Sequence, residues 1–441
     1  MKGSLALSTF VLAVAGHGFG EDPSGPNRFA IQGARLHLGT GEVVTGGIIV
    51  VDDGLITAVG VDVPVPEDAW VIEASEKHVY PGFINAFCDL GLKKTEPGGG
   101  DGGREQEPDL ASGPEDRPAT TPWRAAADEL TLEDERIESW RNAGFTSSVT
   151  APRGGIFPGQ AAFLNLGGGR DRDMVVSSPA ALVVDLTPPG GGRSFPGSLM
   201  GVLAYVEQSF LDATHYRESA KAYESSPRGK KRPSYDRALA PLSRAQTERW
   251  PVLFPANERH EIERAIALAQ DSSVRPVLYG VHEGYAAAEV LRGADVPVLV
   301  SLKWPKKDEK ADPDADEPLR VLRLRDRAPA TPAALEHAGV RFAFYTEDIA
   351  RPEEAMAGIR RAIEAGLSAE AAVAALTLEA ATIFDLADRT GSLEAGKIAN
   401  LFIADGDAFE EGTKVESVFV DGKKYDVPPK VDEDKKEEKT P

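Results

Sequence analysis

Three carboxylates and one imidazole stand where they could do chemistry, each directly after a run of residues that we expect to form a strand. They are Asp89, His282, Glu347 and Asp348. Carboxylates and imidazoles bind divalent metal ions such as Zn²⁺, and they also transfer protons near neutral pH. Each residue also has a structural interpretation: Asp89 could cap the loop after its strand, and His282 could pack within a loop. The residue types alone therefore leave a reactive site and ordinary structural roles both open.

The remaining candidates have a structural interpretation that we prefer. Of the other histidines, His17 lies near the N-terminus, His37 and His78 lie in expected β-structure, and His215, His260 and His337 lie on expected helices. The only cysteine, Cys88, sits inside an expected buried strand, where a small apolar role fits better than nucleophilic chemistry. Because side chains alternate along a strand, we expect Phe87 and Asp89 to point to one side and Cys88 to the other. A single cysteine also excludes an intramolecular disulfide.

The elements that must position these residues fall into three parts. Short β-type runs separated by turn residues fill Phe29–Val79 and indicate a small antiparallel sheet. Strands and helices then alternate as far as residue 376, which is typical of a parallel sheet, open or closed. Two more strands, Asn400–Ala404 and Val415–Val420, follow. Since both ends of the chain are β-type, we expect them to pair into one sandwich.

Two loops and one helix complete the organisation. Residues 93–121 are rich in Gly, Pro, Asp and Glu and form either a lid or a solvated insertion. The Gly-rich loop at residues 151–160 carries Arg153 and Gln160, which we assign to substrate binding; its glycines could cradle a phosphate only weakly, since no helix signal follows. Thr131–Ala143 is predicted to be a helix capped by Thr131 and stopped by Gly144.

Two sequence motifs resemble the amidohydrolase superfamily. PGFINAFCDLG, from Pro81 to Gly91, is similar to the family's first barrel strand, PGFIDAHxHLG. ALTLEAATIFDLADRTGSLEAGKIANLFIADGD, from Ala375 to Asp407, resembles its C-terminal signature. The resemblance extends over about residues 28–425 and is closest to imidazolonepropionase-like members. It implies a (β/α)8 barrel with a composite β-sandwich, in which a metal-activated water attacks a C–N bond.

The resemblance also implies where the metal ligands should lie. In the family they come from strands 1, 5, 6 and 8, often with a lysine from strand 4. Here Phe87 and Pro255 occupy two ligand positions, Asp89 and His282 remain as metal ligands, and Glu347 or Asp348 matches the catalytic carboxylate. No strand-4 lysine can be placed. We expect Asp89, His282 and Glu347 to face one cavity, with His282, Arg153 or backbone amides as partners of Asp89.

The resemblance therefore predicts either of two functions. The first is C–N hydrolysis with most metal ligands replaced and catalysis weak or lost. The expected cofactor is Zn²⁺ if the protein is active, and no cofactor if it is not. The second is a non-catalytic protein on the same scaffold that binds a small molecule or a partner subunit. We expect a homo-oligomer or a paralogous amidohydrolase as possible assembly partners.

Composition and the two chain ends restrict location and partners. The 441 residues carry a net charge of −21, which argues against nucleic acid as a partner. Residues 1–20 have the pattern of a secretory signal, so we expect an exported, periplasmic or extracellular protein without membrane insertion after signal removal. The expected domains are then 28–80 and 391–426 for the sandwich, 81–390 for the barrel, and 427–441 for a disordered acidic tail.

Overall fold

The computed structural model describes residues 27–93, 117–189, 195–307, 316–346 and 349–428. The predicted signal at residues 1–20, most of the 93–121 loop and nearly all of the 427–441 tail lie outside these ranges. So do the two catalytic candidates Glu347 and Asp348. Their predicted roles therefore remain predictions.

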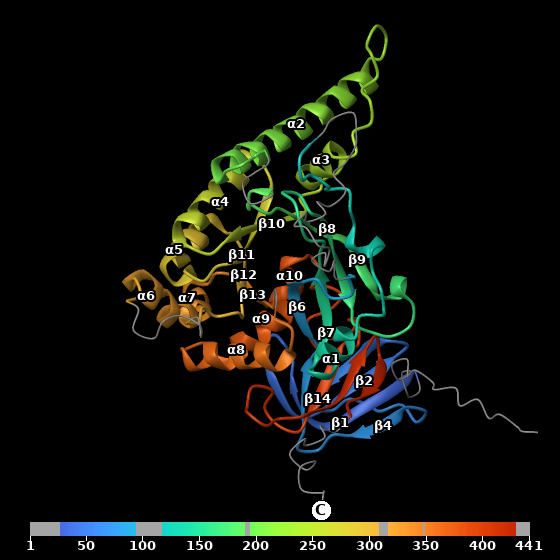
Figure 1. Cartoon of the computed structure of the whole chain (residues 1–441). Helices are drawn as coiled ribbons and strands as arrows, with labels where there is room; N and C mark the ends of the chain where they lie inside the picture. Colours follow the sequence, from blue (N-terminus) through green and yellow to red (C-terminus); the bar gives the residue numbers. More distant parts are fainter. Residues whose placement is uncertain (1–26, 94–116, 190–194, 308–315, 347–348, 429–441) are drawn as a thin grey trace, which may run out of the picture.

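The first of two sheets joins strands from both ends of the chain (Figure 1). It contains β1 (Arg28–His37), β2 (Val43–Asp52), β3 (Leu55–Gly60), β4 (Trp70–Glu73), β5 (His78–Pro81), β14 (Leu401–Ala404), β15 (Val415–Val420) and β16 (Lys423–Asp426). The joint is β5, which runs parallel to β1 on one side and antiparallel to β14 on the other. This confirms the composite sheet. The prediction of a purely antiparallel N-terminal part is wrong, because β4 and β5 both run parallel to β1.

The second sheet has eight strands in the order of the chain and curls into a nearly closed barrel. They are β6 (Phe83–Cys88), β7 (Phe145–Thr150), β8 (Gly159–Asn165), β9 (Val175–Val183), β10 (Pro251–Ala256), β11 (Arg275–Gly280), β12 (Val298–Ser301) and β13 (Phe342–Tyr345). The predicted barrel is confirmed, with one difference. Strand β8, which the sequence did not suggest, runs antiparallel to β7 and β9. Direct β7–β8 and β8–β9 connections replace the helical crossovers that parallel neighbours would require.

Ten α-helices accompany the sheets within the described ranges, several of them along the outer face of β10–β13 (Figure 1). They are α1 (Arg136–Asn142), α2 (Leu199–Ser225), α3 (Leu239–Thr247), α4 (Arg259–Asp271), α5 (Gly284–Ala294), α6 (Leu319–Arg327), α7 (Thr331–Ala338), α8 (Pro352–Glu364), α9 (Ala369–Leu376) and α10 (Leu378–Ile383). The helix predicted at Thr131–Ala143 begins five residues later, at Arg136. Asp134 explains the delay, because its carboxylate accepts hydrogen bonds from the backbone N–H groups of Gly91 and Arg136.

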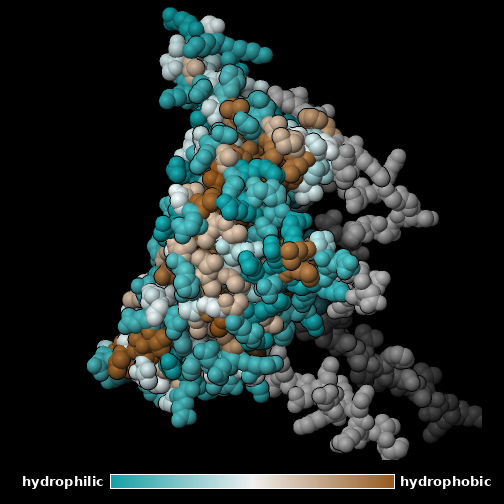
Figure 2. Space-filling view, turned by 90° about the vertical axis from the view of Figure 1, so that its left-hand side faces the viewer, coloured by the Kyte–Doolittle hydropathy of each residue, from teal (hydrophilic) through white to brown (hydrophobic). Residues whose placement is uncertain are grey.

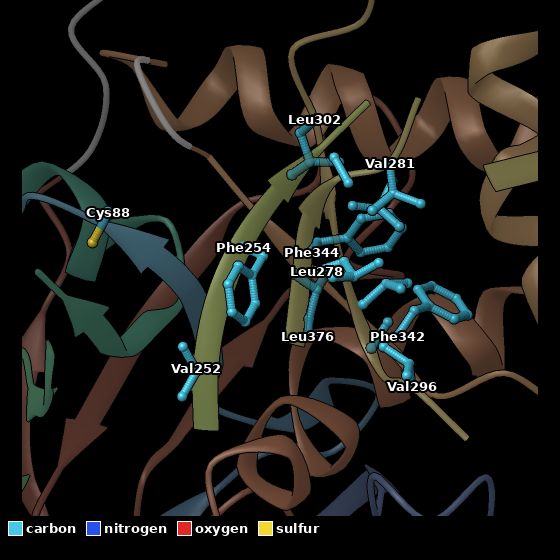
Figure 3. Packing of buried hydrophobic residues seen from close by; sticks show 14 of the residues in the cluster. Cys88, Val252, Phe254, Leu278, Val281, Val296, Leu302, Phe342, Phe344 and Leu376 are labelled. Atoms are coloured by element: carbon cyan, nitrogen blue, oxygen red, sulfur yellow. The ribbon is translucent and has the colours of Figure 1, made fainter. Parts of the chain in front are cut away.

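Alternating side chains on the barrel strands divide two apolar cores. Phe254, Leu278 and Phe344 point outward into the cluster shared with the helices (Figure 3). Their neighbours Leu253, Val277 and Ala343 belong to a second cluster, to which all eight strands contribute and which fills the barrel. The two clusters fix the inward and outward register of each strand at the site.

The surface carries separate apolar patches among predominantly hydrophilic residues on the face that Figure 2 shows. The two most exposed large apolar side chains within the described ranges are Tyr235 and Met200. None of the helices that the structure describes is both long and apolar enough to span a bilayer.

Candidate functional site

A bulge in β6 determines which side chains reach the barrel interior. From Asn85 to Cys88 the strand advances three residues, while its partner β7 advances two, from Ser148 to Thr150. The extra residue breaks the strict alternation of a strand. As a result Ala86 and Phe87 both join the inner cluster, while Cys88 joins the outer one. The predicted sides of Phe87 and Cys88 are confirmed.

Aromatic rings occupy the position where the resemblance places a metal ligand. The ring of Phe87 lies 5.0 Å from that of Tyr279 on β11 and 5.8 Å from that of Tyr345 on β13, measured between centroids. Phe87 and Tyr345 are each 1% exposed, so little water reaches them. The guanidinium carbon of Arg153 lies 5.0 Å from the centroid of the Phe87 ring, which is a cation–π distance. We call Phe87, Tyr279 and Tyr345 the aromatic cluster.

Asn85 links the two ends of the curled sheet. The sheet order ends with β6 on one side and β13 on the other. Asn85 donates from Nδ2 to Thr346 Oγ1 at 2.6 Å and accepts from the backbone N–H of Thr346 at 3.2 Å. A fully buried amide needs such partners, because an unpaired one would cost roughly 1–3 kcal/mol. Its place in the middle of an apolar strand was the sequence signal for this role.

Asp89 is paired with an arginine that the sequence analysis did not name. Its carboxylate accepts from Arg136 Nη1 at 2.6 Å, and its backbone carbonyl accepts from Arg136 Nη2. Arg136 begins α1 and also binds Asp134 at 2.7 Å. Burial alone would lower the pKa of Arg136, but hydrogen bonds to the two aspartates raise it above its ordinary value. The expected partners, Arg153, His282 or backbone amides, are therefore corrected to Arg136.

His282 lies in the loop that follows β11, and its side chain contacts the loop that follows β12. Its ring centroid is 6.2 Å from that of Trp304, and its backbone carbonyl accepts from Thr331 Oγ1 at 2.9 Å. Burial lowers the pKa of His282 to about 4, although a hydrogen bond with the backbone of Lys303 acts in the opposite direction. Nε2 is buried and has no hydrogen-bond partner among the described residues. His282 thus offers one neutral nitrogen donor.

The side chains at these positions do not provide the ligands of the family's metal site. A hydrolytic zinc site needs about three protein ligands and a water. Phe87 and Pro255, which lies two residues after the inward-facing Leu253, bring no lone pair, and Asp89 is already bound by a cation. Among the residues that the structure describes, no three His, Cys, Asp or Glu side chains come together in a way that could hold a metal ion. Of the two candidate ligands in this part of the chain, Asp89 is bound to Arg136, and only His282 has a buried nitrogen without a hydrogen-bond partner among the described residues.

The two predicted substrate-binding residues, Arg153 and Gln160, contact different parts of the protein. Arg153 is exposed and stacks on the aromatic cluster through Phe87. Gln160, on β8, donates from Nε2 to the carbonyl of Pro122 at 2.8 Å and so fastens the segment before α1. The sequence analysis missed Tyr279 and Tyr345, although both alternate with residues of the outer core and could have been assigned to the interior on that basis.

A sequence model of the amidohydrolase family matches residues 258–425, from the start of α4 to β16. No curated protein sequence is significantly similar to the chain.

Solved structures with the same fold cover nearly the whole chain. An amidohydrolase from Thermotoga maritima MSB8 is 24% identical, with a TM-score of 0.76, and the match covers 90% of this chain and 99% of that one. A Xaa-Pro dipeptidase with bound methionine in the active site is 16% identical, with a TM-score of 0.53 over 90% of this chain and 100% of its own. A molinate hydrolase is 15% identical, with a TM-score of 0.53 over 91% and 95% of the two chains. Residues 258–425 of the chain thus match the amidohydrolase family, and the barrel with its composite sheet has the fold of these structures.

Proposed function

We propose that this protein is an amidohydrolase-superfamily member in which metal-dependent hydrolysis of C–N bonds is weak or lost. The observation that carries the proposal is the aromatic cluster. Phe87 packs against Tyr279 and Tyr345 in the barrel interior, where the family motif has a histidine ligand. Aromatic carbon supplies no electron pair to Zn²⁺, so this substitution removes a ligand and fills its space.

The pairing of Asp89 supports the same conclusion. A carboxylate held by the Arg136 guanidinium at 2.6 Å would have to exchange a charge-assisted hydrogen bond for a metal bond. Arg136 would keep Asp134 as a partner, so the exchange is possible but costs a favourable contact. The likeness to hydrolases supports C–N bond cleavage as the chemistry of the fold, while these contacts argue against its efficient use here.

A second candidate is a ligand-binding protein without catalysis. It is favoured by Arg153, whose exposed guanidinium lies over the Phe87 ring. An arginine beside aromatic faces suits a small molecule that combines a carboxylate with an apolar group, because the fork of N–H donors matches a carboxylate. The other form of this candidate, a partner subunit, has no specific contact in its favour.

Hydrolysis assays test whether metal-dependent catalysis is retained. Protein never exposed to chelator is incubated with N-acyl amino acids, cyclic ureides and dipeptides, with and without added Zn²⁺, Mn²⁺ or Co²⁺. We expect no hydrolysis that a chelator abolishes. As a matched control, the Phe87→His, Pro255→His variant returns two donors to the barrel and should take up more metal than the parent. Chelator-sensitive turnover by the unmodified protein would refute the proposal.

A further inference from the structure

Two histidines link β1 to β5, the strand that joins the N-terminal and C-terminal parts of the first sheet. His37 ends β1, and His78 begins β5, the strand that bonds to β1 and β14 at once. The opposing residue of His78 across the β5–β14 ladder is Ala404. Any force between the two imidazoles therefore acts where segments more than three hundred residues apart are held together.

The two rings contact one another directly. Nε2 of His37 lies 3.2 Å from Nδ1 of His78, and the same Nδ1 lies 3.2 Å from the hydroxyl of Tyr80. The His37 ring stacks on Tyr80 with centroids 4.0 Å apart, and Tyr80 stacks on Phe402 of β14 at 5.2 Å. The Tyr80 hydroxyl also accepts from the backbone N–H of Ala408 at 3.2 Å. One column of rings thus crosses the whole joint.

Charged groups reach this column from each neighbouring element. Arg35, on β1, disfavours protonation of both histidines. Asp407, in the loop after β14, favours protonation of both, and Glu410 in the same loop favours that of His78. Tyr80 stays neutral, since burial raises the pKa of its hydroxyl.

We propose that the His37–His78 pair is an acid-sensitive latch, which holds β5 against β1 only while it is not doubly protonated. When both rings are neutral, one nitrogen donates its proton and the other accepts it. When both rings are protonated, each nitrogen is a donor, the shared hydrogen bond is lost, and two like charges face each other 3.2 Å apart. The latch concerns the sandwich and is independent of the function proposed for the barrel.

The direction of the pH effect follows from the burial of the rings. Burial, with the nearby His78, lowers the pKa of His37 from 6.5 to about 4, and burial also lowers the pKa of His78. Below pH 6.5 the unfolded chain therefore binds protons that the folded chain does not. Stability contributed by the neutral pair is complete above that pH and falls as the pH approaches 4. For each such proton, lowering the pH by one unit raises the unfolding equilibrium constant by up to about tenfold.

Urea unfolding between pH 7.5 and pH 5 tests the latch in the full chain. When the pH falls from 7.5 to 5, we expect the unfolding equilibrium constant of the parent to rise by a factor at least about tenfold larger than that of the His37→Gln, His78→Gln variant. His215→Gln is the matched control, because His215 lies on α2, far along the chain from the joint, where its Nε2 lies 3.4 Å from Ser219 Oγ of the same helix. It should keep the parent's pH dependence. Equal pH dependence in the double variant and the parent would overturn the proposal.

If the double variant does not fold, hydrogen exchange of the unmodified protein tests the latch instead. After correction for intrinsic rates, amides of β1 and β5 should lose protection between pH 7.5 and pH 5 more than those of β12 in the barrel. Uniform loss across both sheets, or none, would contradict a latch at this joint.

Discussion

Individual side chains decide whether the barrel can still hold a metal ion. Phe87 is the side chain with the largest effect, because it replaces a donor and anchors the aromatic cluster. Sequence reasoning identified this replacement and its inward direction. It could not identify the partners of Phe87, since Tyr279 and Tyr345 come from strands about 190 and 260 residues later, and only the closed sheet brings them together.

Shortening the side chain of Phe87 tests how much its ring contributes to the stability of the fold. Phe87→Ala would leave a cavity among buried rings, and we expect the free energy of unfolding to fall by about 3–5 kcal/mol. Urea denaturation followed by circular dichroism measures the change. Met200→Ala, at a side chain that is 74% exposed, should stay within about 0.5 kcal/mol of the parent. A loss below about 1 kcal/mol in Phe87→Ala would mean that the ring does not anchor the interior.

Asp89 illustrates a different limit of sequence reasoning. The residue was correctly singled out as needing a partner, but Arg136 was not found, because α1 was predicted to begin at Thr131 and Arg136 then fell inside the helix. The structure shows that Asp134 delays the helix and directs Arg136 back toward Asp89. Local hydrogen bonds of this kind compete with helix formation and are hard to weigh from sequence.

Removing the charge of Asp89 distinguishes an ion-pair role from a metal-ligand role. Asp89→Asn should lower the free energy of unfolding by about 1 kcal/mol, because Arg136 retains Asp134. Metal content should not change. The control is Glu263→Gln, which removes the exposed pair with Arg259 and should have a smaller effect. A change in bound metal without a change in stability would assign Asp89 to a metal site instead.

Among the elements, the composite sheet was predictable and the antiparallel barrel strand was not. Turn residues and short apolar runs at both ends of the sequence predicted that the two ends pair, but not that β5 forms the joint with β14. Strand β8 was not predicted from the sequence, because residues 151–160 are rich in glycine and proline and resemble a long loop. The seam between β6 and β13 likewise depends on the Asn85 side chain rather than on a pattern along either strand.

Truncation tests the composite sheet. A chain ending at Arg389 loses β14, β15 and β16 and exposes the edge of β5 together with buried residues such as Phe402 and Phe419. Because unpaired edges and apolar surface promote aggregation, we expect this chain to be insoluble or unfolded. Deleting residues 429–441 keeps every strand of the described fold and should leave the melting temperature unchanged. A soluble chain ending at Arg389 that unfolds cooperatively would contradict the composite sheet.

For the whole molecule, we propose that the fold is kept while the family's metal chemistry is weak or lost. The chain keeps the barrel, the composite sheet and the family motifs at both ends, yet the positions that should carry metal ligands hold Phe87, Pro255 and an aspartate bound to Arg136. The sequence was informative about the scaffold because apolar periodicity and turn residues repeat along it. It was less informative about the site because a site depends on a few contacts between distant strands.

The metal content of the purified protein tests this account most directly. Elemental analysis of protein that has never met a chelator should find well under one equivalent of transition metal per chain. The account predicts this because Asp89 is bound to Arg136 and only His282, of the two described candidate ligands, has an unpaired nitrogen, where a hydrolytic zinc site needs about three ligands. One full equivalent of metal, lost together with hydrolytic activity in both Asp89→Ala and His282→Ala, would contradict it.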